Sequence, residues 1–99
     1  MQVRPVKLIF VLREALPEIA AKTMFVVPKR NFRRAHDRNL LKRRMREVFR
    51  IRKADLYEIL RSKKKQVSLA LLYTGREEND YAAIDKAITK LLEKLKETI

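Results

Sequence analysis

Residues 37–53, DRNLLKRRMREVFRIRK, carry eight Lys and Arg side chains and only two acids. Like charges four residues apart destabilise a helix, so this composition alone disfavours helical structure in water. Apolar residues nevertheless recur through the stretch at helical spacing, at Leu41, Met45, Val48 and Phe49. That spacing predicts an amphipathic helix, with its apolar side packed on the rest of the domain.

The charged side chains of this predicted helix gather on one side of it. At about 100° per residue, the predicted core arc lies within roughly 80° of Leu41 and contains Met45, Val48, Phe49 and Ile51. A second group lies between about 100° and 200° from Leu41. We call it the basic stripe, and it consists of Asn39, Lys42, Arg43, Arg46, Arg50 and Lys53. Glu47 lies one step outside the stripe and offsets only part of its charge.

The basic stripe indicates a polyanionic partner. Solvated helix faces normally alternate in sign, whereas Lys42, Arg46 and Arg50 repeat the same sign at a spacing of four. The fixed donor fork of arginine suits phosphate oxygens. Long cationic side chains bind the phosphate backbone and recognise the shape of a helix, which is how RNA helices are bound. A DNA recognition helix instead needs short polar side chains that reach base edges. We therefore expect RNA.

Two apolar runs before the stretch predict β-strands. They are residues 6–12, VKLIFVL, and residues 23–27, TMFVV, both containing β-branched residues. Between them, residues 15–20, ALPEIA, contain a proline and predict a connection with one helical turn. Residues 28–37, PKRNFRRAHD, predict a polar, basic loop before the helix.

The chain after the stretch supplies the remaining elements. Residues 54–62, ADLYEILRS, continue the helical pattern, either as the same helix or as a second one after a break near Ala54. Residues 66–73, QVSLALLY, are apolar on both faces, which predicts a central strand. Asp80 suits the N-cap of a last amphipathic helix over residues 81–98. The order strand-strand-helix-strand-helix predicts an α+β fold, a two-layer α/β sandwich, in one domain over residues 1–99.

The net charge and the composition limit the functions that the chain could have. The net charge is +13, and residues 28–65 hold 16 of the 25 basic side chains but only 4 of the 12 acids. Such a concentrated field draws in nucleic acid or an anionic surface. The sequence has no Cys, which excludes a disulfide or a thiolate metal site. It contains no apolar run near the roughly 20 residues of a membrane span, and we expect no signal peptide.

The stripe and its neighbours also match a known pattern. Arg38-Asn39, Lys42-Arg43, Arg46-Glu47 and Arg50 resemble the RNxxKRxxRExxR motif of the protein component of bacterial ribonuclease P. The preceding VPKRNFRRA, residues 27–35, resembles the strand end and loop of that family, and the similarity covers nearly the whole chain. The resemblance implies the sandwich fold known as ribosomal protein S5 domain 2-like, with an unusual left-handed crossover against the general right-handed rule.

The resemblance also implies a function. The family protein is a cytoplasmic bacterial subunit that binds a large catalytic RNA and the 5′ leader of precursor tRNA. The RNA, with Mg²⁺, hydrolyses the phosphodiester that releases the leader, so no catalytic or metal-ligating residue and no obligate protein partner is expected in this chain. The residues expected to contact RNA are Lys29, Arg30, Arg34, Arg38, Asn39, Lys42, Arg43, Arg46 and Arg50.

The sequence departs from the family pattern at three places. His36 stands where a small apolar residue is usual, and Leu40 where Arg is common, so Arg34 or Arg44 is expected to replace the missing cation. As the sole His, His36 fits a helix-start position better than catalysis, because it lacks triad partners at a matching spacing. Family members open with a helix whose aromatics line the leader cleft, and this chain starts almost at the first strand, so we expect an incomplete cleft. Phe10 and Tyr73 either stack leader bases or belong to the core.

Other classes of function fit less well. A ribosome-associated protein that binds ribosomal RNA fits the composition, but the ordered motif disfavours it. A self-contained nuclease needs a carboxylate cluster for metal ions. The acids Glu77, Glu78, Asp80 and Asp85 lack a convergent spacing. Membrane-surface binding lacks exposed Trp or Phe residues beside the stripe.

Overall fold

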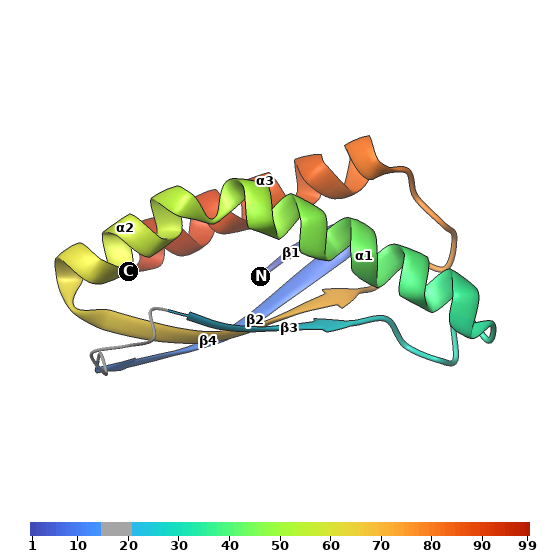
Figure 1. The fold of residues 1–99 in the computed structure, drawn as a ribbon, viewed down its shortest axis with the longest axis horizontal. Helices are drawn as coiled ribbons and strands as arrows, with labels where there is room; N and C mark the ends of the chain where they lie inside the picture. The colour runs from blue at the N-terminus through green and yellow to red at the C-terminus, as the bar shows by residue number, and fades with distance from the viewer. Residues whose placement is uncertain (15–20) are drawn as a thin grey trace.

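The computed structural model describes residues 1–14 and 21–99 (Figure 1). The predicted connection over residues 15–20 lies outside the described residues. In chain order the elements are β1 (Gln2–Val3), β2 (Val6–Glu14), β3 (Ala21–Val26), α1 (Ala35–Arg52), α2 (Ala54–Lys63), β4 (Lys65–Tyr73) and α3 (Tyr81–Thr98). The predicted α+β order is confirmed, with a short extra strand β1 at the start and with the long helix in two parts.

The strands form one mixed sheet with the order β1-β2-β4-β3. β4 pairs antiparallel with β2 and parallel with β3, so it is a central strand, as its two apolar faces predicted. In the register, Ala70 of β4 lies between Ile9 of β2 and Met24 of β3. The chain crosses from β3 to its parallel neighbour β4 through α1 and α2. The left-handed sense of this crossover stays an expectation from the resemblance.

The three helices cover one face of the sheet (Figure 1). Val6 and Leu8 of β2 point toward them and are buried, as are Val67, Leu69 and Leu71 of β4. Alternation along each strand turns the intervening side chains to the other face. There Ile9, Val11 and Met24 keep 51%, 52% and 62% of their surface exposed. The two-layer sandwich is confirmed, and its sheet has one open apolar face.

The long helix begins two residues before Asp37 and is interrupted only at Lys53. Of the predicted core arc, Leu41, Met45, Val48 and Phe49 are buried. The prediction for Ile51 is wrong, because half of its surface is exposed. Phe49 is closed in by the rings of Phe25 and Tyr57, whereas Ile51 lies at the opposite edge of the arc and extends beyond the packed layer.

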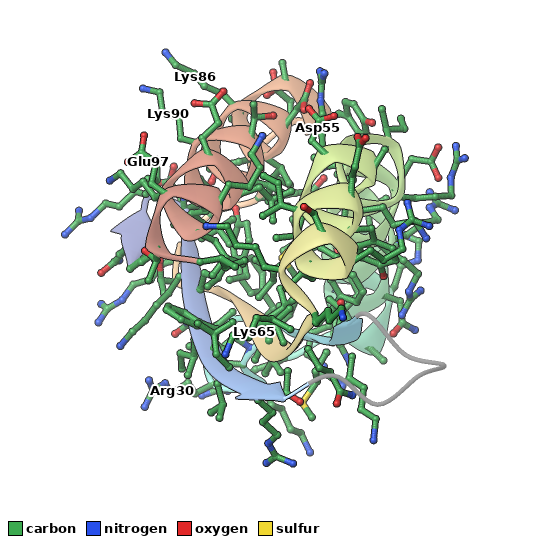
Figure 2. The ribbon with its side chains drawn as sticks, turned by 90° about the vertical axis from the view of Figure 1, so that its left-hand side faces the viewer. Arg30, Asp55, Lys65, Lys86, Lys90 and Glu97 are labelled. Atoms are coloured by element: carbon green, nitrogen blue, oxygen red, sulfur yellow. The ribbon has the colours of Figure 1, made fainter. Side chains whose placement is uncertain are left out.

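The last helix completes the core. The Asp80 side chain accepts a hydrogen bond of 2.9 Å from the Ala83 backbone N–H, which confirms the predicted N-cap. Six apolar residues of α3 are buried against α1, α2 and the sheet: Ile84, Ala87, Ile88, Leu91, Leu92 and Leu95. The opposite side of α3 carries Lys86, Lys90 and Glu97, which project away from the body of the protein (Figure 2). That side is a solvated face of mixed sign.

Candidate nucleic-acid interface

The two flanks of α1 differ in how their cations are neutralised. On the flank toward α3, Arg52 forms two hydrogen bonds of 3.1 Å with the Asp85 carboxylate. Arg44 lies 3.1 Å from the Glu78 carboxylate and donates a 2.8 Å hydrogen bond to the Asn79 carbonyl. Arg44 is bound to the loop before α3, so of the two cations expected to replace the one that Leu40 displaces, Arg34 is the one without such a bond among the described residues.

The opposite flank, the basic stripe, is left with its positive charge. Within residues 1–14 and 21–99, Lys42, Arg43 and Arg46 have no carboxylate partner. Arg43 and Arg46 are exposed, and Lys42 is half-buried. Three neighbouring cations on a helix that is anchored by four buried side chains form a preorganised surface for phosphates.

Arg50 is the member of the stripe that an acid partly neutralises. Its guanidinium donates two hydrogen bonds to the Glu47 carboxylate, one turn earlier on α1. These bonds lower the pKa of Glu47 below its usual value and raise the pKa of Arg50. Both side chains are exposed, and such a pair contributes little to folding. Glu47 therefore offsets only part of the charge of the stripe, as the helical wheel predicted.

Aromatic rings hold two cations of the stripe in place. The Arg46 guanidinium lies over the Phe25 ring at 5.5 Å, and the Lys53 ammonium lies over the Tyr57 ring at 5.2 Å. Phe49 lies between these rings and contacts both edge-on, with centroid distances of 5.9 and 6.5 Å. The row Phe25–Phe49–Tyr57 thus links the edge strand β3 to α1 and α2, directly beneath the cations.

A shallow groove of about 300 Å³ runs along the first half of the stripe. Its lining consists of His36, Asn39, Leu40, Lys42, Arg43 and Arg46. Both residues that depart from the family pattern, His36 and Leu40, therefore lie in the groove beside the expected RNA contacts. His36 is exposed in the first turn of α1. Among the described residues it has no carboxylate or hydroxyl partner, which agrees with a helix-start position.

The basic loop before α1 is tied to the helix by one of its predicted RNA-binding residues. Nη1 of Arg38 donates hydrogen bonds of 2.8 and 2.9 Å to the carbonyls of Phe32 and Arg33. Arg38 is half-buried, and its placement holds the loop in a fixed relation to the stripe. Lys29, Arg30 and Arg34 are exposed around this loop. The described structure therefore gives Arg38 a positioning role, in addition to any contact with RNA.

The two aromatic residues considered for base stacking lie on the helix-facing side of the sheet. Tyr73 is completely buried, and its single hydroxyl hydrogen is shared between the Glu77 carbonyl and the Asn79 side-chain oxygen, each 2.5 Å from the hydroxyl oxygen. No ring face of Tyr73 is open to a base, so the core alternative is correct for this residue. Phe10 is half-buried and packs against the core. It also lines a hollow on the open face of the sheet, so its stacking role stays a prediction.

Sequence reasoning missed the open face of the sheet as part of the candidate site. A hollow of about 390 Å³ lies there, and its lining includes Ile9, Val11, Met24, Lys22 and Ala70. The sequence signal for this face was the set of alternate residues Lys7, Ile9, Val11 and Arg13 along β2, which point to the same side of the sheet. A single layer of helices leaves one face of a sheet uncovered, so this set could have been expected there. Apolar and basic residues on this face alternate in a way that suits an unpaired nucleic-acid strand.

The acidic residues considered for a nuclease do not converge. Glu78 pairs with Arg44, Asp80 caps α3 and Asp85 pairs with Arg52. In the described part of the chain, no three His, Cys, Asp or Glu side chains are placed to hold a metal ion. The described helices include none with the length and apolar character needed to cross a membrane.

Comparison with known proteins places the chain in a family. The family model described as Ribonuclease P matches residues 2–96. A ribonuclease P protein component from Porphyromonas gingivalis strain W83 is 33% identical over 75 residues, which cover 75% of this chain and 55% of that protein. The same component from strain ATCC 33277 is 28% identical over 90 residues, which cover 91% of this chain and 66% of that protein.

The chain thus spans less than two thirds of the length of these curated relatives. No solved structure matched. The match over residues 2–96, together with the basic stripe on a helix that follows β3, leads to one conclusion: the chain belongs to the ribonuclease P protein family.

Proposed function

We propose that this chain is the RNA-binding protein subunit of a bacterial, cytoplasmic ribonuclease P and assists a catalytic RNA in removing the 5′ leader from precursor tRNA. The observation that carries the proposal is the basic stripe. Among the described residues Lys42, Arg43 and Arg46 have no acidic partner, while acids elsewhere in the chain neutralise Arg44 and Arg52. Both relatives are named ribonuclease P protein component, and this name supplies the RNA-processing context.

The stripe would bind the backbone of the catalytic RNA. Each cation that replaces a condensed counterion on a phosphate favours binding and makes the affinity fall with salt. Arg46 is held over Phe25, so less conformational entropy is lost when it meets a phosphate. The cleavage chemistry belongs to the RNA and to Mg²⁺ held by the RNA and the substrate. The described residues offer cations and amides for binding and bring no carboxylate cluster together.

The open face of the sheet would hold the leader of the precursor tRNA. Ile9, Val11 and Met24 provide apolar surface for unpaired bases, and Lys7 and Lys22 lie on the same face to meet phosphates. β3 separates this face from Arg46 and the stripe, so one edge strand lies between the two surfaces. A strand that leaves the catalytic RNA at the stripe could pass over this edge onto the sheet.

Reconstitution with the cognate catalytic RNA tests the proposal. The wild-type chain is expected to bind that RNA and to restore leader removal from precursor tRNA at low Mg²⁺. Arg43→Ala should weaken RNA binding and make the slope of log affinity against log salt shallower by about 0.7–0.9 for each phosphate that is no longer neutralised. Arg44→Ala, one residue away on the flank toward α3, is the matched control and should keep the wild-type slope.

Two results would sink the proposal. One is a wild-type chain that fails to bind the catalytic RNA or to stimulate leader removal. The other is an equal loss of salt dependence in Arg43→Ala and Arg44→Ala, because RNA binding would then not distinguish the two flanks of α1. Co-purification with ribosomes in the absence of the processing RNA would favour the ribosome-associated alternative.

A further inference from the structure

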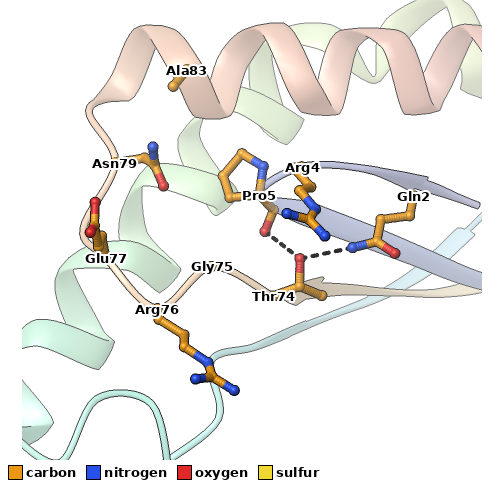
Figure 3. A pocket seen from close by; sticks show the side chains of 9 residues that line it. All are labelled: Gln2, Arg4, Pro5, Thr74, Gly75, Arg76, Glu77, Asn79 and Ala83. Atoms are coloured by element: carbon orange, nitrogen blue, oxygen red, sulfur yellow. Dashed lines mark hydrogen bonds between the residues drawn. The ribbon is translucent and has the colours of Figure 1, made fainter.

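A polar pocket lies away from the stripe, between the start of β2 and the loop that joins β4 to α3 (Figure 3). Its volume is about 530 Å³, which falls within the range of pockets that hold small ligands or single nucleotides. The lining combines two arginines with amide and hydroxyl groups: Gln2, Arg4, Pro5, Thr74, Gly75, Arg76, Glu77, Asn79 and Ala83. The segments that form it are some 70 residues apart in the sequence.

Hydrogen bonds fix the floor of this pocket. The Thr74 backbone N–H and its hydroxyl both donate to the Pro5 carbonyl, at 2.8 and 3.2 Å. The Gln2 amide donates to the Thr74 hydroxyl at 3.3 Å. Figure 3 shows this chain of contacts running from Gln2 through Thr74 to Pro5, with Arg4 beside it.

Close packing fixes the rim. The buried Tyr73 hydroxyl donates to the Glu77 carbonyl and accepts a 3.0 Å hydrogen bond from the Asn79 backbone N–H. A Cβ on Gly75 would lie 3.1 Å from both the Pro5 side chain and the Tyr73 ring, so a larger residue would crowd this contact. The loop that carries Arg76 is therefore preorganised before any ligand arrives.

The charge of the pocket is positive and unneutralised. Arg4 and Arg76 are both exposed, and across the described residues neither guanidinium has a hydrogen bond or an ion pair. Glu77 also lines the pocket, but it lies at the outer edge, away from Arg4 (Figure 3). Two guanidinium groups with nearby amides of Gln2 and Asn79 are donors that suit a phosphodiester.

The topology brings this pocket to the same end of the sheet as the basic loop. β3 and β4 run parallel and end together, with Val26 opposite Leu72, and β2 begins there, with Val6 opposite Tyr73. The ring of Phe32, in the loop with Lys29 and Arg30, contacts the Tyr73 ring edge-on at 5.6 Å. The loop and the pocket therefore share one packed support at the same end of the sheet.

We infer that the pocket is a second RNA-backbone site, in which Arg4 and Arg76 bind neighbouring phosphates of the RNA that also contacts the basic loop. This inference rests on the proposed function and extends its footprint around the end of the sheet. A small anion such as inorganic phosphate could bind the same donors, but its binding would not depend on the stripe. A continuous RNA strand requires that both surfaces contribute to one binding event.

The first test removes charge from the pocket in the full-length chain. Arg4→Ala/Arg76→Ala is expected to lower affinity for the cognate catalytic RNA about tenfold. It should also make the salt slope shallower by about 0.7–0.9 for each phosphate that the pocket no longer neutralises. Arg4→Lys/Arg76→Lys should recover most of the slope. Lys86→Ala/Lys90→Ala on the outer side of α3 is the control for a generic loss of two charges and should bind like wild type.

The second test locates the RNA. The chain has no Cys, so Glu77→Cys, beside the pocket arginines, provides a unique attachment point for an iron–EDTA hydroxyl-radical source. Cleavage of bound RNA at a discrete position is expected from residue 77 and not from Lys86→Cys. Inorganic phosphate should fail to protect the RNA from this cleavage at millimolar concentration, which distinguishes an RNA site from a site for the free anion.

The outcomes separate the pocket from the stripe. The pocket inference alone would be overturned if Arg4→Ala/Arg76→Ala kept the affinity and salt slope of the wild type while the stripe variant Arg43→Ala was impaired. Equal losses in the pocket variant and in the Lys86→Ala/Lys90→Ala control would overturn it as well, because only overall charge would then matter. A wild-type chain that does not bind the RNA at all would overturn the proposed function and this inference together.

Discussion

Arg46 of α1 lies over the ring of Phe25 on β3, with 5.5 Å between the guanidinium carbon and the ring centroid. The contact joins the basic stripe to the edge strand of the sheet. An arginine held against an aromatic face keeps its outer nitrogens in a limited set of positions, which lowers the entropy that an RNA phosphate must remove on binding. The Phe25 ring also packs edge-on against Phe49, so the support continues into the core.

Replacing the ring without removing the cation tests this support. Phe25→Leu is expected to reduce affinity for the catalytic RNA about two- to fivefold, because the ring contributes about 0.5–1 kcal/mol to holding Arg46 in position. Titration of labelled RNA measures the change. Phe10→Leu, which removes a half-buried ring that does not touch Arg46, should leave that affinity unchanged. Unaltered binding by Phe25→Leu would mean that the stack does not help Arg46 to bind.

Leu40 offers a gain of function. It lines the groove of the stripe at a position where the related pattern often has Arg. Leu40→Arg should add one phosphate contact, tighten RNA binding and steepen the salt slope by about 0.7–0.9. Leu40→Gln is the neutral, polar control. A variant with Arg at this position that binds no better than wild type would place the RNA backbone away from this part of the groove.

Tyr73 is expected to matter for folding through its hydroxyl. Tyr73→Phe leaves the Glu77 carbonyl and the Asn79 side chain without their donor, in a partly buried loop. The free energy of unfolding should fall by about 1–3 kcal/mol. Urea denaturation followed by circular dichroism gives this value. Tyr81→Phe, on an exposed ring, should unfold like wild type, and an equally stable Tyr73→Phe would show that the hydroxyl network adds nothing to stability.

Acid should weaken the link between α1 and α3. Hydrogen bonding to Arg52 holds the pKa of Asp85 below its ordinary value, so folding favours the ionised carboxylate. The contribution is complete above the unfolded-state pKa of about 4, and it is lost as the pH falls through the lower folded-state pKa. Asp85→Asn should therefore be slightly less stable at pH 7.

The same variant should lose less stability than wild type between about pH 5 and pH 3. Denaturation midpoints measured across this range check the difference. Glu93→Gln, on the outer side of α3, is the control for removal of an exposed acid. Parallel pH profiles of Asp85→Asn and wild type would show that the pair with Arg52 does not contribute to folding.

Local sequence determined much of this protein. The period of Leu41, Met45, Val48 and Phe49 defined the buried side of α1, and the same wheel placed Lys42, Arg43 and Arg46 together. Asp80 marked the start of α3, and the two apolar faces of residues 66–73 marked a central strand. These features depend on contacts within one turn of helix or on alternation along one strand, so a short window of sequence contains them.

Only the tertiary structure decided which cations are free. Arg44 and Arg52 are neutralised by acids more than 30 residues later, because α3 packs beside α1, whereas Arg43 faces solvent. The exposure of Ile51, the burial of Tyr73 and the placement of Arg4 and Arg76 around one pocket likewise depend on how distant segments pack. A sequence pattern records how a side chain is oriented on its own element. The charge or surface that another element brings to it is set by the fold.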